Sequence, residues 1–228
     1  MLANRRDFLR SALAIQFTAA VVVPARAQVS GLSGQGGGGP MRIAILADTS
    51  EAAASSLVHM RAALLAFVET IAPEHEVLVA STGRRLEVRA QPTTDRAKIK
   101  AAVTGLLADN GPTPLVDSLR EIDERFMRKT TDRAPVFVIV TADGTESSSR
   151  TDDKAFNVWG EDLMRRRVVV HAIVLKIKGN GAPEAVAGSL ARSTGGHFET
   201  ISSGQALPEK LKIVAERIQR DYEQRWRR

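Results

Sequence analysis

From residue 42 onward, short apolar runs alternate with longer segments in which apolar residues recur every three to four positions. Short apolar runs are typical of buried strands, and the longer spacing is typical of amphipathic helices. The pattern predicts strands at 42–47, 76–81, 85–89, 136–141, 167–175 and 197–201. It predicts helices at 52–71, 95–107, 115–127, 154–165, 184–192 and 207–226.

The alternation of strands and helices determines the predicted fold class. Strands separated by helices need crossover connections, which make a mainly parallel sheet with helices on both faces. A turn at 82–84 folds the 85–89 strand back on its neighbour, and charged residues alternate there with Leu86 and Val88, as at an exposed edge. We therefore expect an α/β fold: a doubly wound, Rossmann-like, mainly parallel sheet with one antiparallel edge strand. Ligands of such sheets bind beyond the carboxyl ends of the strands.

The N-terminal residues differ from the rest. Arg5 and Arg6 precede an apolar run at 11–23, and a small-x-small sequence ends at Ala27. This order predicts a signal peptide at 1–27, cleaved before Gln28, and hence a periplasmic or secreted bacterial protein. The arginine pair resembles a twin-arginine signal. An ordinary secretory signal and an uncleaved N-terminal anchor are the alternatives. No integral membrane span is expected in the mature chain.

Residues 28–40 are rich in glycine and serine and predict a flexible linker. The glycine run is not read as a phosphate loop, because no Gly-Lys-Ser/Thr follows it and it precedes the first strand. One folded domain is then expected at 41–226.

Composition excludes several function classes. The chain has no cysteine, which removes disulfides, thiolate catalysis and cysteine-ligated metals. The formal net charge is +6, and residues 1–27 carry four of the basic and one of the acidic side chains, so removing them leaves +3. That mild charge, with one Tyr and two Trp in the chain, does not indicate a nucleic-acid partner.

Three segments expected at the carboxyl edge of the sheet carry oxygen donors. Asp48 and Ser50 follow the first strand, Thr113 precedes a helix, and Asp143 follows the most hydrophobic strand. Carboxylates and hydroxyls without His or Cys are ligands that suit Mg²⁺, Mn²⁺ or Ca²⁺. The sequence therefore predicts a divalent-metal site.

These segments resemble the metal-ion-dependent adhesion site of von Willebrand factor type A (VWA) domains. The matching motifs are Asp-x-Ser after the first strand, Gly-x-Thr-Pro-Leu at 111–115 and Asp-Gly at 143–144, with further similar stretches at 76–79, 95–96 and 190–198. The resemblance covers nearly all of 41–226, which is therefore expected to be one VWA domain. It implies four metal ligands, Asp48, Ser50, Thr113 and Asp143, and a partner protein whose Asp or Glu completes the coordination.

Ala52 departs from the family pattern, which has a second loop serine there. Since water can fill an octahedral position around Mg²⁺, the loss of one neutral donor is expected to weaken metal binding rather than abolish it. The alternative is a relic site in which Asp48 and Thr113 only cap helices.

The leading functional hypothesis is an exported protein-binding, adhesion or scaffold module and not an enzyme. The alternative is a periplasmic metal-dependent hydrolase, because two carboxylates and a metal can hydrolyse phosphoesters. The sequence has neither a Gly-x-Ser-x-Gly elbow nor a Gly-x-Gly-x-x-Gly after its first strand. A third possibility is a metal-free domain that serves as an assembly surface.

Overall fold

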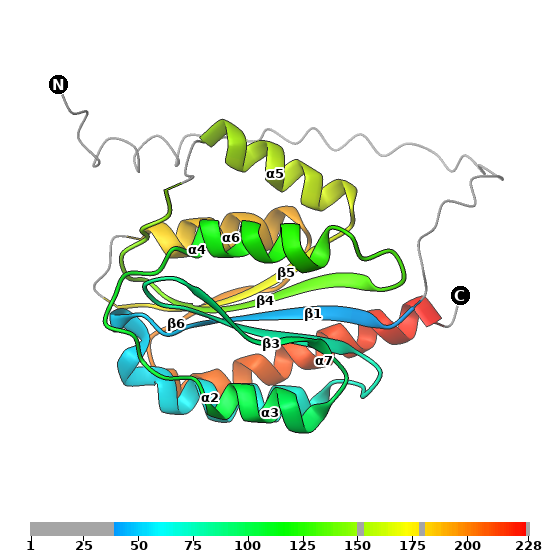
Figure 1. The fold of residues 1–228 in the computed structure, drawn as a ribbon, viewed down its shortest axis with the longest axis horizontal. Helices are drawn as coiled ribbons and strands as arrows, with labels where there is room; N and C mark the ends of the chain where they lie inside the picture. The colour runs from blue at the N-terminus through cyan, green and yellow to red at the C-terminus, as the bar shows by residue number, and fades with distance from the viewer. Residues whose placement is uncertain (1–38, 150–152, 178–180, 227–228) are drawn as a thin grey trace. The chain divides into compact units, whose positions relative to one another are not determined.

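The computed structural model describes residues 39–149, 153–177 and 181–226, with the backbone alone at 225–226. The predicted signal peptide at 1–27 lies outside the described residues, as does the predicted linker except for Gly39 and Pro40. The described part is a sheet between two layers of helices (Figure 1).

Six strands form one sheet in the order β3-β2-β1-β4-β5-β6. Their bounds are β1 Met41–Asp48, β2 Glu76–Thr82, β3 Leu86–Thr93, β4 Ala134–Ala142, β5 Val169–Leu175 and β6 Phe198–Ile201. Neighbouring strands are parallel except β2 and β3, which are antiparallel. The predicted fold class is confirmed, including the antiparallel strand at the sheet edge.

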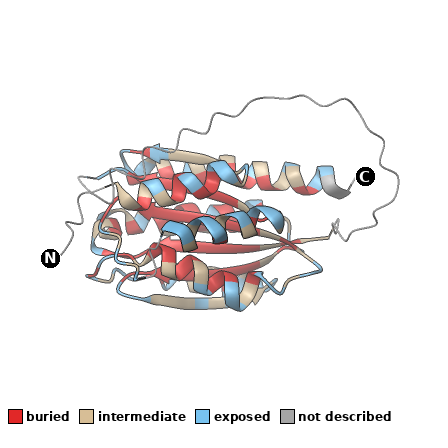
Figure 2. Ribbon diagram, turned by 90° about the horizontal axis from the view of Figure 1, so that it is seen from above, coloured by how far each residue is buried: buried red, intermediate tan, exposed pale blue. Residues whose placement is uncertain are grey.

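The helical segments are η1 Glu51–Ser56, α2 Leu57–Thr70, α3 Arg96–Thr104, α4 Leu115–Ile122, η2 Asp123–Met127, α5 Asp153–Arg165, α6 Ala182–Ser193, η3 Gly204–Ala206 and α7 Leu207–Trp226. Helices α4, α5 and α6 cover one face of the sheet, and α2, α3 and α7 cover the other (Figure 1). Each face has its own core: Ile43 and Ile45 of β1 belong to one, and Ala44 and Leu46 to the other. The central strands are accordingly buried, while the outer helix faces are exposed (Figure 2).

Several predicted elements differ in detail. The strand predicted at 85–89 continues to Thr93, and the helix predicted at 95–107 ends at Thr104. The helix predicted at 52–71 begins as the 3-10 helix η1, and the one predicted at 115–127 ends as the π-helical turn η2. The strand predicted from 167 begins at Val169, because Arg167 has a φ of 56° and lies in the left-handed region. Apolar spacing alone does not separate these helix types, since all of them bury one side.

By length and composition, Glu51–Thr70 could cross a membrane, and it is the one such segment among the described residues. Within the domain, however, Met60, Leu64 and Phe67 on this segment are fully buried in the core that α2 shares with α7. Packing inside the domain therefore accounts for the apolar composition of this helix.

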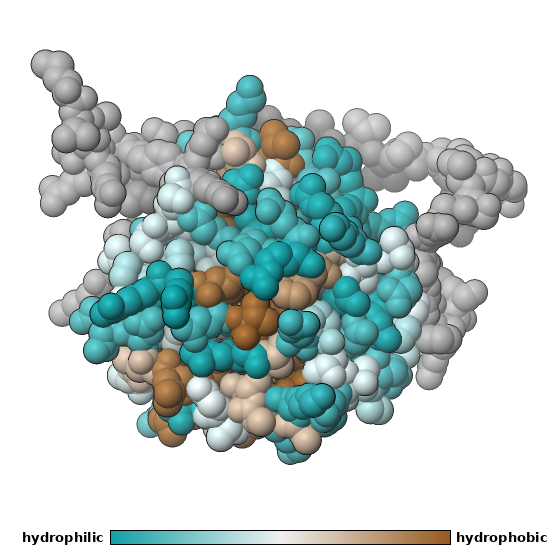
Figure 3. Space-filling model, in the orientation of Figure 1, coloured by the Kyte–Doolittle hydropathy of each residue, from teal (hydrophilic) through white to brown (hydrophobic). Residues whose placement is uncertain are grey.

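Large apolar side chains are exposed at scattered positions of the described surface: Val58, Leu107, Val158, Met164 and Ile177. On the face shown in Figure 3, small apolar patches are separated by hydrophilic side chains. That view therefore shows no broad apolar surface.

The strand order reverses between β1 and β4. From β1 the chain moves outward through β2 and β3, and from β4 it moves outward in the other direction through β5 and β6. The loops after β1 and β4 therefore leave the sheet side by side, at the switch point where doubly wound folds bind ligands. Asp48 ends β1 and Asp143 follows β4.

Candidate metal site

Asp48 connects the ends of the two central strands. Its side chain is fully buried, and Oδ1 accepts a hydrogen bond from the backbone N of Ser50 at 2.8 Å. Oδ2 accepts hydrogen bonds from the Thr141 hydroxyl and from the backbone N of Ala142, both at 2.9 Å. Burial raises the pKa of the Asp48 carboxyl, and these hydrogen bonds, led by that of Ala142, oppose the rise. The carboxylate is thus held in one orientation at the switch point.

Asp143 lies one residue beyond β4 and is buried. Its backbone N donates to the carbonyl of Leu175 at 2.8 Å, so the loop starts in register with β5. Its Oδ1 atom has no hydrogen-bond partner among the described residues. Burial raises the pKa of this carboxyl, the negative charge of Glu184 raises it further, and Lys176 lowers it.

Ser50 and Thr113 come from different loops, and both are buried. Ser50 Oγ lies near enough to Asp48 to lower the pKa of its carboxyl, but no hydrogen bond of ordinary geometry within the described residues reaches it. Thr113 Oγ1 donates to the hydroxyl of Thr82 at 2.9 Å. Thr82 is the β2 neighbour of Asp48 in the sheet. The hydroxyl of Thr113 is therefore directed at the end of β2, next to the end of β1.

Backbone hydrogen bonds join the loops that carry these residues. Thr113 N donates to the Thr145 carbonyl, and Ser147 N donates to the Thr113 carbonyl, both at 3.0 Å. On the other side, Glu51 N donates to the Gly111 carbonyl at 3.1 Å. The loop with Thr113 thus contacts both the loop after β1 and the loop after β4, and the four predicted residues converge on one buried region.

The capping interpretation of this cluster is wrong. The N-cap of η1 is Ser50 and that of α4 is Pro114, and neither helix start has a side-chain cap from its own cap residue. Asp48 instead bridges two strands, and Thr113 contacts Thr82.

Ala52 faces the loop that carries Asp143. A Cβ built on Gly144 would lie 2.6 Å from the Cβ of Ala52, a separation that side chains do not reach without movement. The two loops therefore approach this closely because residue 144 is glycine. The methyl group of Ala52 stands next to the residue that follows Asp143.

The cluster fits a hard divalent cation. Buried polar atoms in proteins nearly always have a hydrogen-bond partner, yet Ser50 Oγ and Asp143 Oδ1 have none within the described residues. Two carboxylates and two hydroxyls form a donor set that suits Mg²⁺ or a similar ion. The described residues contain no cluster of three or more His, Cys, Asp or Glu side chains able to hold a metal, so any cation here would be balanced by only two carboxylates.

Sequence reasoning missed three supporting residues: Thr82, Thr141 and Glu146. Thr82 ends β2 and Thr141 is the penultimate residue of β4, the two strands on either side of β1, and they hold Thr113 and Asp48. Glu146 contacts the start of α4 through a hydrogen bond from Leu115 N at 3.2 Å. Proline cannot cap a helix with its side chain, so Pro114 indicated that α4 needs an acceptor from elsewhere in the chain. The sequence did not indicate that Glu146 provides this acceptor.

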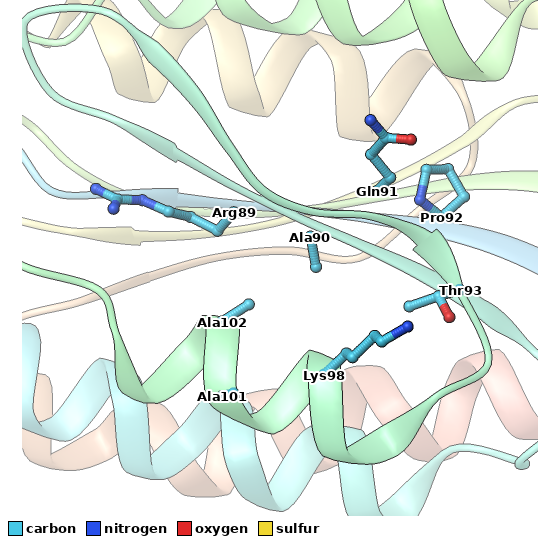
Figure 4. Close-up of a pocket in the computed structure, with 8 residues that line it drawn as sticks. All are labelled: Arg89, Ala90, Gln91, Pro92, Thr93, Lys98, Ala101 and Ala102. Carbon is cyan, nitrogen blue, oxygen red and sulfur yellow. The ribbon is translucent and has the colours of Figure 1, made fainter.

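A separate hollow of about 510 Å³ lies between β3 and α3 (Figure 4). It is lined by Arg89, Ala90, Gln91, Pro92, Thr93, Lys98, Ala101 and Ala102. None of these residues belongs to the candidate metal site. Its charged side chains are already paired, Arg89 with Glu87 and Lys98 with Asp95.

Comparison with known protein families matches residues 43–146 to the von Willebrand factor type A domain. Comparison with curated proteins gives no match.

Solved structures of low sequence identity share the fold. A von Willebrand factor type A protein from Catenulispora acidiphila aligns with a TM-score of 0.66 and 15% identity, over 79% of this chain and 43% of that one. Proximal thread matrix protein 1 from the mussel byssus, with a zinc-occupied MIDAS motif, aligns with a TM-score of 0.62 and 18% identity, over 78% and 45%. The domain of the type V pili tip protein Mfa5 from Porphyromonas gingivalis aligns with a TM-score of 0.61 and 12% identity, over 81% and 96%.

This chain spans less than half the length of the first two of these structures. At such identities the likeness concerns the fold. The family match at 43–146, the six-stranded sheet and the structural neighbours agree on one fold, that of von Willebrand factor type A domains.

Proposed function

We propose that this chain is an exported bacterial protein-binding module, with an adhesion or scaffold role, that recognises a partner protein through a divalent cation. Asp48, Ser50, Thr113 and Asp143 would hold the cation, Mg²⁺ in the first place and Mn²⁺ or Ca²⁺ otherwise. One observation carries the proposal. Ser50 Oγ and Asp143 Oδ1 are buried oxygens from two different loops at the switch point of the sheet, and neither has a hydrogen-bond partner of ordinary geometry within the described residues.

The protein's own residues orient the site. Thr141 and Ala142 hold the Asp48 carboxylate, and Thr82 holds the Thr113 hydroxyl. When bound, the cation would supply an exchangeable coordination position, because four protein ligands leave part of an octahedral shell to water. An Asp or Glu carboxylate of the partner suits that position. The proposed activity is binding without turnover.

The names of the structural neighbours support this kind of role. The mussel byssus protein is a matrix protein with zinc at its MIDAS motif, and the Porphyromonas protein is a pilus tip protein. Mg²⁺ is preferred for this chain because its four proposed ligands are hard oxygen donors, whereas zinc sites more often include nitrogen or sulfur.

Thermal unfolding of the full-length protein tests the metal site. Melting is measured in EDTA and in excess Mg²⁺ or Mn²⁺. A ligand that binds only the folded state at 100 times its Kd adds about 2.7 kcal/mol of stability. The melting temperature of the wild type is therefore expected to rise with metal, and Asp143→Asn is expected to abolish the rise.

Asp109→Asn is the matched control. Asp109 lies in the neighbouring loop and pairs with Arg84 at 3.3 Å, and it is not one of the four proposed ligands. This variant should keep the full metal-dependent rise. The absence of any rise in the wild type, or an unchanged rise in Asp143→Asn, would contradict the proposal.

A further inference from the structure

Helix α4 obtains its N-terminal cap from another loop. The first backbone N–H groups of a helix have no acceptor inside the helix. Pro114, at the N-cap, makes no side-chain cap. Instead, Leu115 N donates to Glu146 Oε2 at 3.2 Å, and Asp117 N donates to Ser148 Oγ at 3.0 Å. The loop after β4 therefore completes the helix that begins two residues beyond Thr113.

Glu146 also fixes the loop on which it lies. Its Oε1 atom accepts a hydrogen bond from Ser148 N at 2.7 Å. The backbone on both sides of Glu146 pairs with Thr113, through Thr145 and Ser147. The Glu146 carboxylate thus connects the segment that carries Thr113 with its own loop, on which Asp143 lies three residues before Glu146.

We infer that Glu146 is a positioning residue for the metal site. Its two carboxylate oxygens are occupied by backbone N–H groups, so it acts on the cation through the placement of Thr113 and Asp143 rather than as a ligand. A carboxylate is also favourable at a helix N-terminus, because it complements the helix dipole. This inference rests on the proposed function.

Asp117 offers a matched control within the same structure. Its Oδ2 atom accepts hydrogen bonds from the backbone N of Ser149 at 2.8 Å and from the Ser149 hydroxyl at 2.9 Å. Asp117 thus binds the same loop, but it does so at Ser149. Ser149 is six residues after Asp143 in the sequence, whereas Glu146 is three residues after it. Replacing Glu146 by Gln or Asp117 by Asn removes one negative charge in either case, so a simple charge effect on metal binding would appear in both variants.

The test measures Mn²⁺ affinity of the full-length protein, from the electron paramagnetic resonance signal of free Mn²⁺. Residues that orient metal ligands typically change affinity by about 10- to 100-fold when mutated. Glu146→Gln is expected to weaken Mn²⁺ binding by about tenfold, since one acceptor oxygen becomes a donor amide. Asp117→Asn is expected to leave the affinity near that of the wild type.

Amide hydrogen exchange in EDTA gives a readout that needs no metal. In Glu146→Gln the amides of Leu115 and Ser148 should exchange faster, whereas in Asp117→Asn the amide of Ser149 should exchange faster and that of Leu115 should not change. If Glu146→Gln does not fold, Ser148→Ala, which removes the neighbouring cap at constant charge, should weaken Mn²⁺ binding in its place.

The outcomes separate the two claims. A wild type that binds no Mn²⁺ overturns the proposed function and this inference with it. A wild type that binds Mn²⁺, together with equal affinities in Glu146→Gln and the wild type, overturns the inference alone. Equal losses in Glu146→Gln and Asp117→Asn would also overturn it, because charge would then explain both.

Discussion

The methyl group of Ala52 borders the candidate site, next to Gly144. Serine at this position would add a hydroxyl oxygen beside the loop of Asp143, where the family pattern has its second loop serine. We expect Ala52→Ser to tighten Mg²⁺ or Mn²⁺ binding by about tenfold, which corresponds to about 1.4 kcal/mol. Calorimetric titration of the full-length protein with Mn²⁺ measures the change.

Ala54→Ser serves as the control for this prediction, because residue 54 lies on the same 3-10 helix and receives the same chemical change. Its affinity should equal that of the wild type. Weaker or unchanged Mn²⁺ binding by Ala52→Ser would show that position 52 does not face the cation.

His171 makes the stability of the domain depend on pH. It is buried in β5, where Nδ1 accepts a hydrogen bond from the backbone N of His197 at 3.0 Å. Burial, with smaller effects of the charges on Arg217 and His197, lowers its pKa to about 3. An unfolded histidine titrates near 6.5, so between about pH 6.5 and 3 the unfolded chain takes up a proton that the folded chain does not.

The free energy of unfolding should therefore fall as the pH is lowered through this window. His171→Asn keeps an acceptor near Nδ1 but does not titrate, so its stability should fall less steeply, by about 3 kcal/mol between pH 7 and 4. Urea unfolding at several pH values measures the slopes. Equal slopes in the wild type and His171→Asn would contradict the prediction.

At the level of single residues, the sequence predicted the site residues that belong to a local motif. It missed the residues whose role depends on a contact with a distant part of the chain. Asp48 and Asp143 follow apolar strands, so their location at the sheet edge could be predicted. Thr82 contacts Thr113 across 31 residues, and Glu146 contacts Leu115 across the same separation. Such pairs depend on which strands are neighbours, which no local pattern encodes.

Among the secondary-structure elements, long amphipathic segments were predicted best. The apolar stripe of α7 is buried throughout: Leu207, Leu211, Val214, Ile218 and Tyr222. The π-helical turn η2 was not foreseen, because its side chains continue the apolar spacing of α4. What sets η2 apart is a buried carboxylate, Asp123, whose partners come from and just after α5.

Asp123 joins η2 to α5 through a buried ion pair. It is fully buried and accepts hydrogen bonds from Arg166 Nη1 at 3.0 Å, Arg166 Nη2 at 2.7 Å and Trp159 Nε1 at 2.9 Å. Removing one partner of a buried pair typically costs about 3 kcal/mol or more. We expect Asp123→Asn to lower the free energy of unfolding by about that amount, measured by urea denaturation.

Asp162→Asn is the comparison for this prediction. Asp162 also binds Arg166, at 2.9 Å, but its side chain is 23% exposed, so water can replace the lost charge. Its loss should cost about 1 kcal/mol or less. Similar costs for the two variants would mean that burial of Asp123 does not determine its contribution.

On the scale of the whole molecule, the alternation of strands and helices predicted two helical layers around a mainly parallel sheet. It did not determine the strand order, because β1 and β4 pair although they are far apart in the chain. That pairing creates the switch point and brings the loops of Asp48 and Asp143 together. The candidate site therefore exists because the strand order brings these loops together. Each sequence motif supplies only part of it, so the site can be predicted only when the motifs are considered together.

The proposed role also requires that the domain reach a partner outside the cytoplasm. The signal proposed at 1–27 lies outside the described residues, and its arginine pair can be tested directly. When the full-length chain is expressed in a bacterial host, the mature protein should appear in the periplasm with Gln28 as its first residue. Changing Arg5 and Arg6 together to lysine keeps the charge but should leave the uncleaved 24.6 kDa chain in the cytoplasm, if a twin-arginine receptor reads the pair.

Cell fractionation with mass spectrometry of the N-terminus distinguishes the possible routes, and Arg26→Lys controls for a general effect of lysine in the signal. Export of the double-lysine variant at the wild-type level would indicate an ordinary secretory signal, which tolerates lysine in its charged region. An uncleaved wild type in the membrane fraction would indicate an N-terminal anchor. A twin-arginine route would suit this domain, because it exports proteins that have already folded. The candidate site joins loops from distant parts of the chain, so it would be exported already assembled.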